Sequence, residues 1–289
     1  MLDRIFKRDK QENASEPFMN EKRCIGLIAG SGQFPLILSE EAKKKNMEVF
    51  AAAFIGEADP LLKETASDIQ WLHLGQLKRL ITYFKKNGIS QAVMAGAIKK
   101  TKMFTDIKPD IKALSMIIGM RHTHDDAILR AFAAVLEKEG ITIMPSTFLV
   151  PELLAEEGCW TKKKPSEDQR KDIEIGWEIA KKIGYLDIGQ CVVIGGGSVL
   201  AVEAVEGTDL TIRRGGELGK GNGVVVKLCK PNQDTRFDIP AVGVDTVITM
   251  KDSGVKVLAI EAGRTIAFDK AEMIEIADNA GICITALKK

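Results

Sequence analysis

The sequence lacks a cysteine framework, a long hydrophobic run and an excess of either charge. The five cysteines in 289 residues are widely spaced and form no Cys-x-x-Cys pair, which excludes a disulfide-rich fold and a zinc knuckle. The longest uncharged apolar stretch, Cys191–Val202, contains three glycines and is far shorter than the roughly 20 residues of a membrane-spanning helix. We therefore expect a protein of the reducing cytoplasm that meets a membrane only from the side.

The charges are almost balanced, with 41 Lys and Arg against 40 Asp and Glu and a formal net charge of +1. Proteins that bind nucleic acid usually carry a clear basic excess. We therefore expect no nucleic-acid partner, and any anionic ligand must be met by local charge. A hydrophobic content of 45% excludes disordered and collagen-like classes and is enough for one large core or two ordinary ones.

The first part of the chain predicts a Rossmann-like domain over residues 24–150, after a polar extension over residues 1–23 that has no signal-peptide core. Strands are expected where apolar residues run together, and helices where they recur every three or four residues. The predicted strands are Cys24–Ala29, Glu48–Phe54, Gln91–Ile98 and Ile141–Met144, and the predicted helices are Gln33–Lys45, Gln76–Lys86 and Ala127–Glu139. This alternation is typical of a parallel sheet covered on both faces.

The second part predicts a distinct α+β domain over residues 165–289, joined to the first by a linker over residues 151–164. Ser166 and Gln169 have the spacing of a capping box at the start of a helix, and Asp269 with Glu272 predicts another. Between these helices the pattern is mostly strand. The predicted strands are Gln190–Ile194 and Val199–Val205, paired as a hairpin, then Gly223–Cys229, Val255–Ile260, Thr265–Phe268 and residues 282–287. The fold class is therefore α/β, with a parallel-sheet first domain and a different second domain.

A glycine turn, Gly30-Ser31-Gly32, separates the first predicted strand from its helix. Backbone N–H groups and the helix dipole favour a phosphate at such a turn. The turn lacks the third glycine of a dinucleotide-binding fingerprint, because Pro35 stands there, and no acidic residue closes the second strand to hold a ribose. An NAD-dependent oxidoreductase is therefore disfavoured. Two interpretations remain, an anion or sugar site and a turn whose small residues only allow close packing.

His122, His124, Asp125 and Asp126 combine imidazoles and carboxylates at the spacing of a transition-metal cluster. Asp125 has a simpler role, because it comes just before the predicted helix and can cap the N–H groups of its first turn. We favour capping over metal binding.

The densest polar constellation lies between residues 203 and 245. Between Thr211 and Arg236, six basic residues against two acidic ones give a local net charge of +4. The basic residues are Arg213, Arg214, Lys220, Lys227, Lys230 and Arg236. Pro231 and Pro240 stiffen the segment that carries Asp234 and Asp238.

Basic residues beside paired carboxylates suit a phosphate ester bound with a hard divalent ion. A carboxyl with a pKa of about 3.9 is a poor general base at neutral pH unless burial raises that pKa. We therefore expect Asp234 and Asp238 to be metal ligands, for Mg²⁺ or alternatively Mn²⁺, and a salt-bridged surface loop is the competing interpretation. The sequence contains no P-loop, G-x-S-x-G, H-E-x-x-H or EF-hand motif.

Several strings together resemble the LpxI family, the UDP-2,3-diacylglucosamine pyrophosphatases of lipid A biosynthesis. They are IGLIAGSGQFPLIL, QAVMAGAIKK, DDAILRA, LDIGQCVVIGGGSVLAVEAVEGTDLTIRR, KPNQDTRFDIPAVGVDT and EAGRT, in this order from Ile25 onward. The resemblance implies a Mg²⁺-dependent hydrolase that cleaves UDP-2,3-diacylglucosamine into UMP and 2,3-diacylglucosamine 1-phosphate (lipid X), with water attacking the α-phosphorus. It also implies two domains that close over the lipid, the second of them catalytic.

The resemblance also implies site residues. The family's most important aspartate, in an Arg-x-Asp-[Leu/Ile]-Pro string, falls on Asp238, and we expect Asp238, Asp234 and Arg236 to be catalytic. We expect substrate contacts from Gly30, Ser31, Gly32, Gln33, Thr208, Asp209, Lys227, Lys230 and Gln233. The sequence departs from the family where Lys99 or Lys100 replaces an arginine.

The location and partners follow from the same resemblance. We expect a cytoplasmic enzyme in transient contact with the inner membrane surface of a Gram-negative bacterium, and a homodimer is left open. The alternative is a non-catalytic protein that binds a nucleotide sugar or a lipid phosphate through the same loop.

Overall fold

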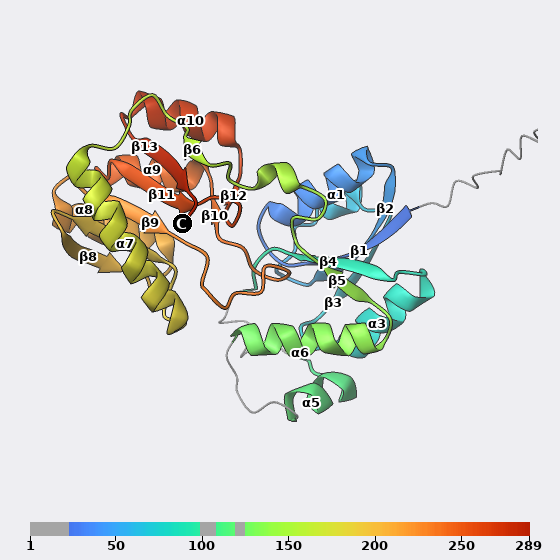
Figure 1. Ribbon diagram of the computed structural model, residues 1–289. Helices are drawn as coiled ribbons and strands as arrows, with labels where there is room; N and C mark the ends of the chain where they lie inside the picture. Colours follow the sequence, from blue (N-terminus) through green and yellow to red (C-terminus); the bar gives the residue numbers. More distant parts are fainter. Residues whose placement is uncertain (1–22, 99–107, 119–124) are drawn as a thin grey trace, which may run out of the picture.

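Two separate sheets organise the chain, one in each half. The computed structural model describes residues 23–98, 108–118 and 125–289 (Figure 1). Residues 1–22, Lys99, Lys100, His122 and His124 lie outside the described residues, so the predictions made for them stay predictions.

The first domain contains a five-stranded parallel sheet in the order β3-β2-β1-β4-β5. Its strands are β1 (Arg23–Ala29), β2 (Met47–Phe54), β3 (Asp68–Leu72), β4 (Gln91–Ala95) and β5 (Thr142–Met144). Its helices are α1 (Phe34–Lys44), α2 (Leu62–Thr65), α3 (Leu77–Lys86), α5 (Ile111–Ile118) and α6 (Asp125–Lys138). The predicted parallel-sheet domain is confirmed.

Both faces of this sheet are buried, as its apolar strands require. Successive residues of β1 point to opposite faces. Leu27 packs with Leu38 of α1 in one apolar layer, and Ile28 packs with Leu80 of α3 and Leu136 of α6 in the other. The sheet is therefore a rigid centre that fixes where its strand ends lie.

The second domain contains a six-stranded mixed sheet in the order β6-β13-β11-β9-β7-β8, in which β9, β11 and β13 are parallel. Its strands are β6 (Gly158–Cys159), β7 (Cys191–Gly195), β8 (Ser198–Val202), β9 (Val224–Lys227), β11 (Val257–Glu261) and β13 (Cys283–Leu287). Its helices are α7 (Glu167–Tyr185), α8 (Thr208–Gly219), α9 (Val244–Asp252) and α10 (Lys270–Asn279). Helix α7 covers one face, and α8, α9 and α10 cover the other.

Short elements join the two sheets. The predicted linker, residues 151–164, contains the 3-10 helix η1 (Pro151–Leu153) and β6, which pairs with β13 and so belongs to the second sheet. Two further strands, β10 (Ala241–Val242) and β12 (Ile266–Ala267), form a small parallel pair beside the second sheet.

The two sequence signals at the start of the second domain are confirmed. The Ser166 hydroxyl accepts from the Gln169 N–H, and the Gln169 side chain accepts from the Ser166 N–H, which completes the capping box of α7. The predicted hairpin is β7 and β8. Its turn is held by the buried carboxylate of Asp172, which accepts from the N–H groups of Gly196 and Gly197 at 3.1 and 2.7 Å.

Other expectations for helices are wrong. The stretch after β8 is not mostly strand, because it contains α8 and α9. Asp269 does not cap α10 with its side chain, since its backbone is left-handed, with φ of 48°. Helix α6 begins at Asp125, two residues earlier than predicted, and capping by the Asp125 side chain stays a prediction.

The glycine turn after β1 is a point of backbone contact. Gly30 donates its N–H to the Ala95 carbonyl at 2.8 Å, and a Cβ at Gly30 would lie 2.5 Å from the Ala97 carbonyl oxygen. A Cβ at Gly96 would lie 2.5 Å from the Ser31 carbonyl oxygen. Close packing therefore requires a glycine at position 30, and the anion-site interpretation of the turn stays a prediction.

We predict that Gly30→Ala destabilises the protein by about 1–3 kcal/mol, because the added methyl group meets a carbonyl that the sheet holds in place. Ser31→Ala is the matched control, since it removes only one hydrogen bond, from Ser31 Oγ to the Ala97 carbonyl, at a cost near 1 kcal/mol. Urea unfolding followed by circular dichroism measures both. A Gly30→Ala variant as stable as the unsubstituted protein would contradict the close contact.

Candidate active site

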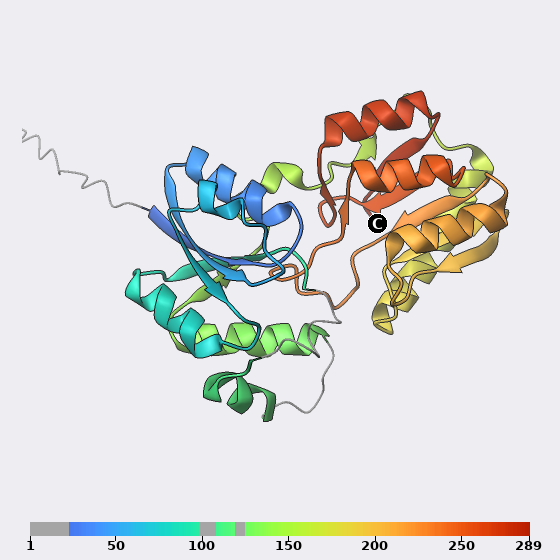
Figure 2. The same cartoon turned by 180° about the vertical axis from the view of Figure 1, so that it is seen from behind.

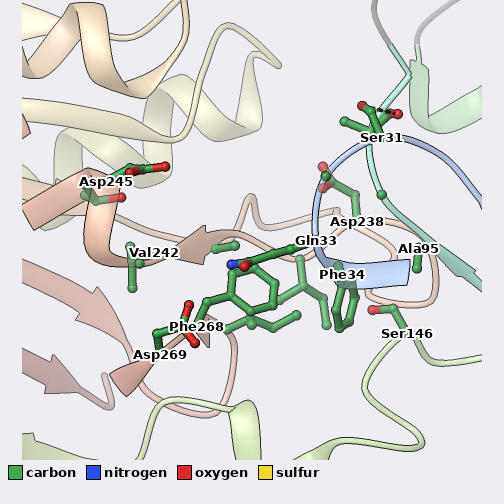
Figure 3. A pocket seen from close by; sticks show the side chains of 18 of the residues that line it. Ser31, Gln33, Phe34, Ala95, Ser146, Asp238, Val242, Asp245, Phe268 and Asp269 are labelled. Carbon is green, nitrogen blue, oxygen red and sulfur yellow. Dashed lines mark hydrogen bonds between the residues drawn. The ribbon is translucent and has the colours of Figure 1, made fainter. Parts of the chain in front are cut away.

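A pocket of about 730 Å³ lies between the two domains. The first domain contributes residues 31–34, 94–97 and 146, and the second contributes residues 237–239, 241–246, 266, 268, 269 and 272. Figure 3 shows Ser31 and Asp238 near each other at one side, and Asp245 and Asp269 across the pocket. Of the predicted site residues, Ser31, Gly32, Gln33 and Asp238 line this pocket, and Gly30 does not.

The first domain presents the N-terminal end of α1 to the pocket. Gln33 is the N-cap residue of α1, with Phe34 next and Pro35 within the first turn. The first N–H groups of a helix have no partner within the helix and carry a partial positive charge. Gly32 has φ of 92°, a conformation that a glycine adopts without strain. This end of the pocket therefore suits an anion.

The second domain reaches the pocket through the loop Lys230–Pro240, which extends onto the first domain (Figures 1 and 2). Arg130 of α6 donates to the Asn232 carbonyl at 2.7 Å, and Ser146 Oγ lies 3.4 Å from the Thr235 carbonyl. Phe237 packs against the apolar layer under α3 and α6. The loop is thus anchored at several points to the domain it reaches.

Arg236 and Asp234 form the polar anchor of this loop. Arg236 donates to both carboxylate oxygens of Asp234, with Nη2–Oδ2 at 2.8 Å and Nε–Oδ1 at 3.0 Å, and through Nη1 to Glu137 of α6 at 2.8 Å. These hydrogen bonds hold the pKa of the Asp234 carboxyl below its ordinary value and raise the pKa of Arg236. Arg236 therefore reaches the first domain through Glu137, and neither Arg236 nor Asp234 lines the pocket.

Asp238 comes at the end of the same loop and does line the pocket. Its backbone N–H donates to the Asp234 carbonyl at 3.3 Å, so the anchored turn sets the position of Asp238. The Gln233 amide nitrogen donates to Asp238 Oδ2. The buried ring of Pro240 closes the loop. Asp238 is consequently an exposed carboxylate on a restrained backbone.

The charge of the pocket lining is negative. Four carboxylates line it, those of Asp238, Asp245, Asp269 and Glu272, and its described lining includes no Lys, Arg or His. Lys99 and Lys100 follow the lining segment after one intervening residue but lie outside the described residues. Among described residues, no group of three or more His, Cys, Asp or Glu is arranged to hold a metal ion.

The remaining predicted contacts lie away from the pocket lining. Thr208 starts α8 and donates to the buried carboxylate of Glu203 at 2.8 Å, and Asp209 follows it in the first turn. Lys230 forms an ion pair with Asp187 at 2.6 Å. Lys227 is buried at the end of β9 and donates to the carbonyl of Ala241, a lining residue, at 2.7 Å.

The six basic residues counted between Thr211 and Arg236 therefore do not gather around one anion. Arg213 and Arg214 lie on α8, where Arg214 pairs with Glu206 at 2.7 Å, and Lys220 is the C-cap residue of that helix. The sequence has a local net charge of +4, but the structure places these basic residues on different elements and pairs several of them with carboxylates. The expectation of a concentrated basic loop is wrong.

Several lining residues were not singled out from the sequence. Phe34 and Phe268 stack edge to face across the pocket floor, with ring centroids 5.5 Å apart, one from each domain. Asp245 lies in the first turn of α9, two residues after the glycine N-cap. No local motif marks these positions, because they become neighbours only when the two domains meet.

A second pocket of about 880 Å³ adjoins the first and shares Gly32 and Gln33 with it. Its apolar walls come from Leu36, Ile55 and Trp71. Lys63 lies over the Trp71 ring, 5.8 Å from its centroid. The glycine turn thus has the more polar of the two pockets on one side and the more apolar one on the other.

Two α/β domains with a carboxylate-lined pocket between them define a two-domain protein whose candidate site is built from both halves. The profile of the LpxI N-terminal domain matches residues 24–153, and that of the LpxI C-terminal domain matches residues 156–285. The chain belongs to the LpxI family.

A curated relative and two solved structures are similar to the chain. The relative is the UDP-2,3-diacylglucosamine pyrophosphatase LpxI of Caulobacter vibrioides, 32% identical over 91% of this chain and 96% of its own length. The biotin carboxylase domain of Hydrogenobacter thermophilus 2-oxoglutarate carboxylase is 15% identical, with a TM-score of 0.27 over 67% of this chain and 40% of that one. Phosphoribosylglycinamide synthetase of Anaerococcus prevotii is 11% identical, with a TM-score of 0.27 over 62% and 38%. The two structures are too distant to support an argument.

We predict that Asp234→Asn lowers the stability of the protein at pH 7 and that this loss disappears in acid. The pKa of Asp234 is lower in the folded protein than its ordinary value of 3.8, so its stabilising effect is present above pH 3.8 and is lost as the pH falls through the folded pKa. The loss at pH 7 is about 1 kcal/mol or less, because the pair is partly exposed. Urea unfolding between pH 7 and pH 3 measures it, and a difference that does not change over this range would count against the ion pair.

Proposed function

We propose that the protein hydrolyses the pyrophosphate bond of UDP-2,3-diacylglucosamine to UMP and 2,3-diacylglucosamine 1-phosphate, as a step of lipid A biosynthesis. The observation that carries the proposal is the meeting of Asp238 and the glycine turn in one pocket of a chain that belongs to the LpxI family. The extent of the similarity to the curated pyrophosphatase supports the same substrate.

A divalent cation is part of the proposal, because the pocket lining and the substrate are both negative. Carboxylate oxygens are hard donors, and Mg²⁺ usually takes one or two of them together with phosphate oxygens and water. The lining fits this requirement, with Asp238 as the residue that would hold Mg²⁺ or Mn²⁺. When bound, the ion would offset phosphate charge and polarise a phosphoryl oxygen.

Asp234 and Arg236 enter the proposal in a different role from Asp238. Metal binding by Asp234 would compete with its hydrogen bonds from the Arg236 side chain, so we assign Asp234 and Arg236 to holding the loop. The N-terminal end of α1, with Ser31, Gly32 and Gln33, would bind a phosphate group. A water molecule attacking the α-phosphorus would leave the second phosphate on the sugar, which gives the two stated products.

The proposed substrate carries two acyl chains, so the enzyme must take it from a membrane surface. Among the described residues, every helix is too short or too polar to span a bilayer. Helix α5 exposes four large apolar side chains, Ile111, Leu114, Ile117 and Ile118. It packs against α3, whose sequence LKRLITYFKK contains four basic residues and no acidic one. We propose that α5 and α3 meet the anionic cytoplasmic surface of the inner membrane.

We predict that Asp238→Asn lowers the release of UMP from UDP-2,3-diacylglucosamine by roughly 100-fold or more, as expected for a group that offsets charge in the transition state. The melting temperature should stay close to that of the unsubstituted protein, because Asp238 is exposed. Glu156→Gln is the control, since Glu156 pairs with Lys270 outside the pocket lining. EDTA should abolish the activity and added Mg²⁺ restore it.

Three outcomes would count against parts of this proposal. No UMP release with any divalent metal would remove the hydrolase assignment and favour a non-catalytic protein that binds a nucleotide sugar. Near-normal kcat in Asp238→Asn would place the reacting centre elsewhere. Full activity after metal removal would exclude the cation.

We predict that Ile118→Glu weakens binding to phosphatidylglycerol vesicles at least several-fold, because Ile118 is 82% exposed on α5 and a charge there opposes insertion at the interface. Hydrolysis of a detergent-dispersed substrate should be unchanged. Val205→Glu is the matched control, as Val205 is a 91% exposed apolar residue of the other domain. Flotation with phosphatidylglycerol and phosphatidylcholine vesicles measures binding, and equal flotation of the two variants would exclude α5.

A further inference from the structure

We propose that Lys181 and Glu261 are positioning residues that orient the carboxylate of Asp238 through Cys229 and Gln233. This inference rests on the proposed function, because it concerns the same site. None of these four residues lines the pocket. Each belongs to a chain of hydrogen bonds that leads from the core of the second domain to Asp238.

The chain starts with a charged pair between α7 and the end of β11. Lys181 Nζ lies 2.9 Å from Glu261 Oε1 and 2.8 Å from Glu261 Oε2, and Glu261 is only 6% exposed. Arg264 Nη1 also lies 3.6 Å from Glu261 Oε1. A buried carboxylate is stabilised when it is both paired and hydrogen-bonded, so the position of Glu261 is well fixed.

The Lys181–Glu261 pair binds both the N–H and the carbonyl group of Cys229. The Cys229 N–H donates to Glu261 Oε2 at 3.1 Å, and Lys181 Nζ donates to the Cys229 carbonyl at 3.3 Å. Cys229 is buried and lies just before the loop Lys230–Pro240. The ion pair therefore sets the point from which that loop leaves the second domain.

Gln233 transmits this position to Asp238. Its amide oxygen accepts from the Lys230 N–H at 3.0 Å and from the Cys229 thiol at 3.3 Å. An amide whose oxygen accepts from two donors must direct its nitrogen the other way. That nitrogen donates to Asp238 Oδ2, which restrains the carboxylate on the edge of the pocket.

This chain of hydrogen bonds should affect the rate of hydrolysis, because Asp238 is exposed on a loop and depends on these partners for its position. Loss of a hydrogen-bonding partner behind a reactive group typically costs about 10–100-fold in activity, since small displacements of that group weaken the transition state more than substrate binding. Loss of the hydrogen bonds that fix the Gln233 amide should therefore lower kcat and leave KM nearly unchanged.

The test compares four variants of the full-length protein with UDP-2,3-diacylglucosamine and Mg²⁺. Glu261→Gln removes the charge that holds Lys181, and Cys229→Ala removes only the thiol donor to Gln233. Cys229→Ser restores a donor at the same place. Asp172→Asn is the matched control, because Asp172 is another buried carboxylate, 5% exposed, that accepts from two backbone N–H groups at a distant turn.

We expect Glu261→Gln to lower kcat by about 10-fold with KM within twofold, Cys229→Ala to lower it less, and Cys229→Ser to recover most of the loss. Asp172→Asn should lower the melting temperature but keep kcat. The side-chain amide resonance of Gln233 in ¹⁵N–¹H NMR spectra, measured without substrate, should shift in Glu261→Gln and Cys229→Ala and not in Asp172→Asn.

The readouts separate this inference from the proposed function. Normal kcat in both Glu261→Gln and Cys229→Ala, with an active unsubstituted enzyme, would overturn the inference and leave the function intact. An inactive unsubstituted protein would overturn the function. In that case an unmoved Gln233 resonance would overturn the inference as well, and a shifted one would support the connection.

Discussion

The arrangement of the site depends on the guanidinium of Arg236. It is bonded to Asp234 in its own loop and to Glu137 of α6 in the other domain. A planar guanidinium has several donors in fixed directions, so it holds two carboxylates at once where an ammonium group would hold them loosely. Phe237 packs on the first domain beside it. The second domain thereby places a carboxylate, Asp238, opposite a turn that belongs to the first.

The two halves of the pocket are fixed by different forces. The glycine turn is held by the backbone contacts that join Gly30 and Ser31 to the end of β4, and so by the core of a parallel sheet. Asp238 is held by hydrogen bonds of its loop, which are weaker and partly exposed. Loops on rigid scaffolds often carry reactive groups for this reason. Any rearrangement of the pocket should involve the loop before it involves the turn.

Much of the fold could be predicted from the sequence, because it depends on local patterns. The apolar strand before Gly30, the capping box at Ser166 and the hairpin before Ser198 each need only neighbouring residues. Helix α8 was missed because Gly215 and Gly216 disfavour a helix on local grounds. They are required there, since a Cβ at Gly215 would lie 2.5 Å from Val193 and one at Gly216 2.3 Å from the Ser253 carbonyl oxygen. The same limit applies to the site, where Asp238 was identified through its motif but Phe268 and Asp245 join it only through tertiary contacts.

The distribution of charge is the clearest difference between sequence and structure. The basic residues near Asp238 in the sequence are neutralised by partners such as Asp187, Glu206 and Glu137, so they supply little field at the pocket. Its described lining has carboxylates and no cationic side chain. Two phosphates placed against these carboxylates would repel them at short range, where little solvent screens the interaction. The helix N-terminus offsets only about half a charge. A pyrophosphate can therefore bind stably here only if a cation comes with it or if further basic residues, such as Lys99 and Lys100, take part. By the same reasoning, a chain with a net charge of +1 would need no global basic excess to bind such a ligand.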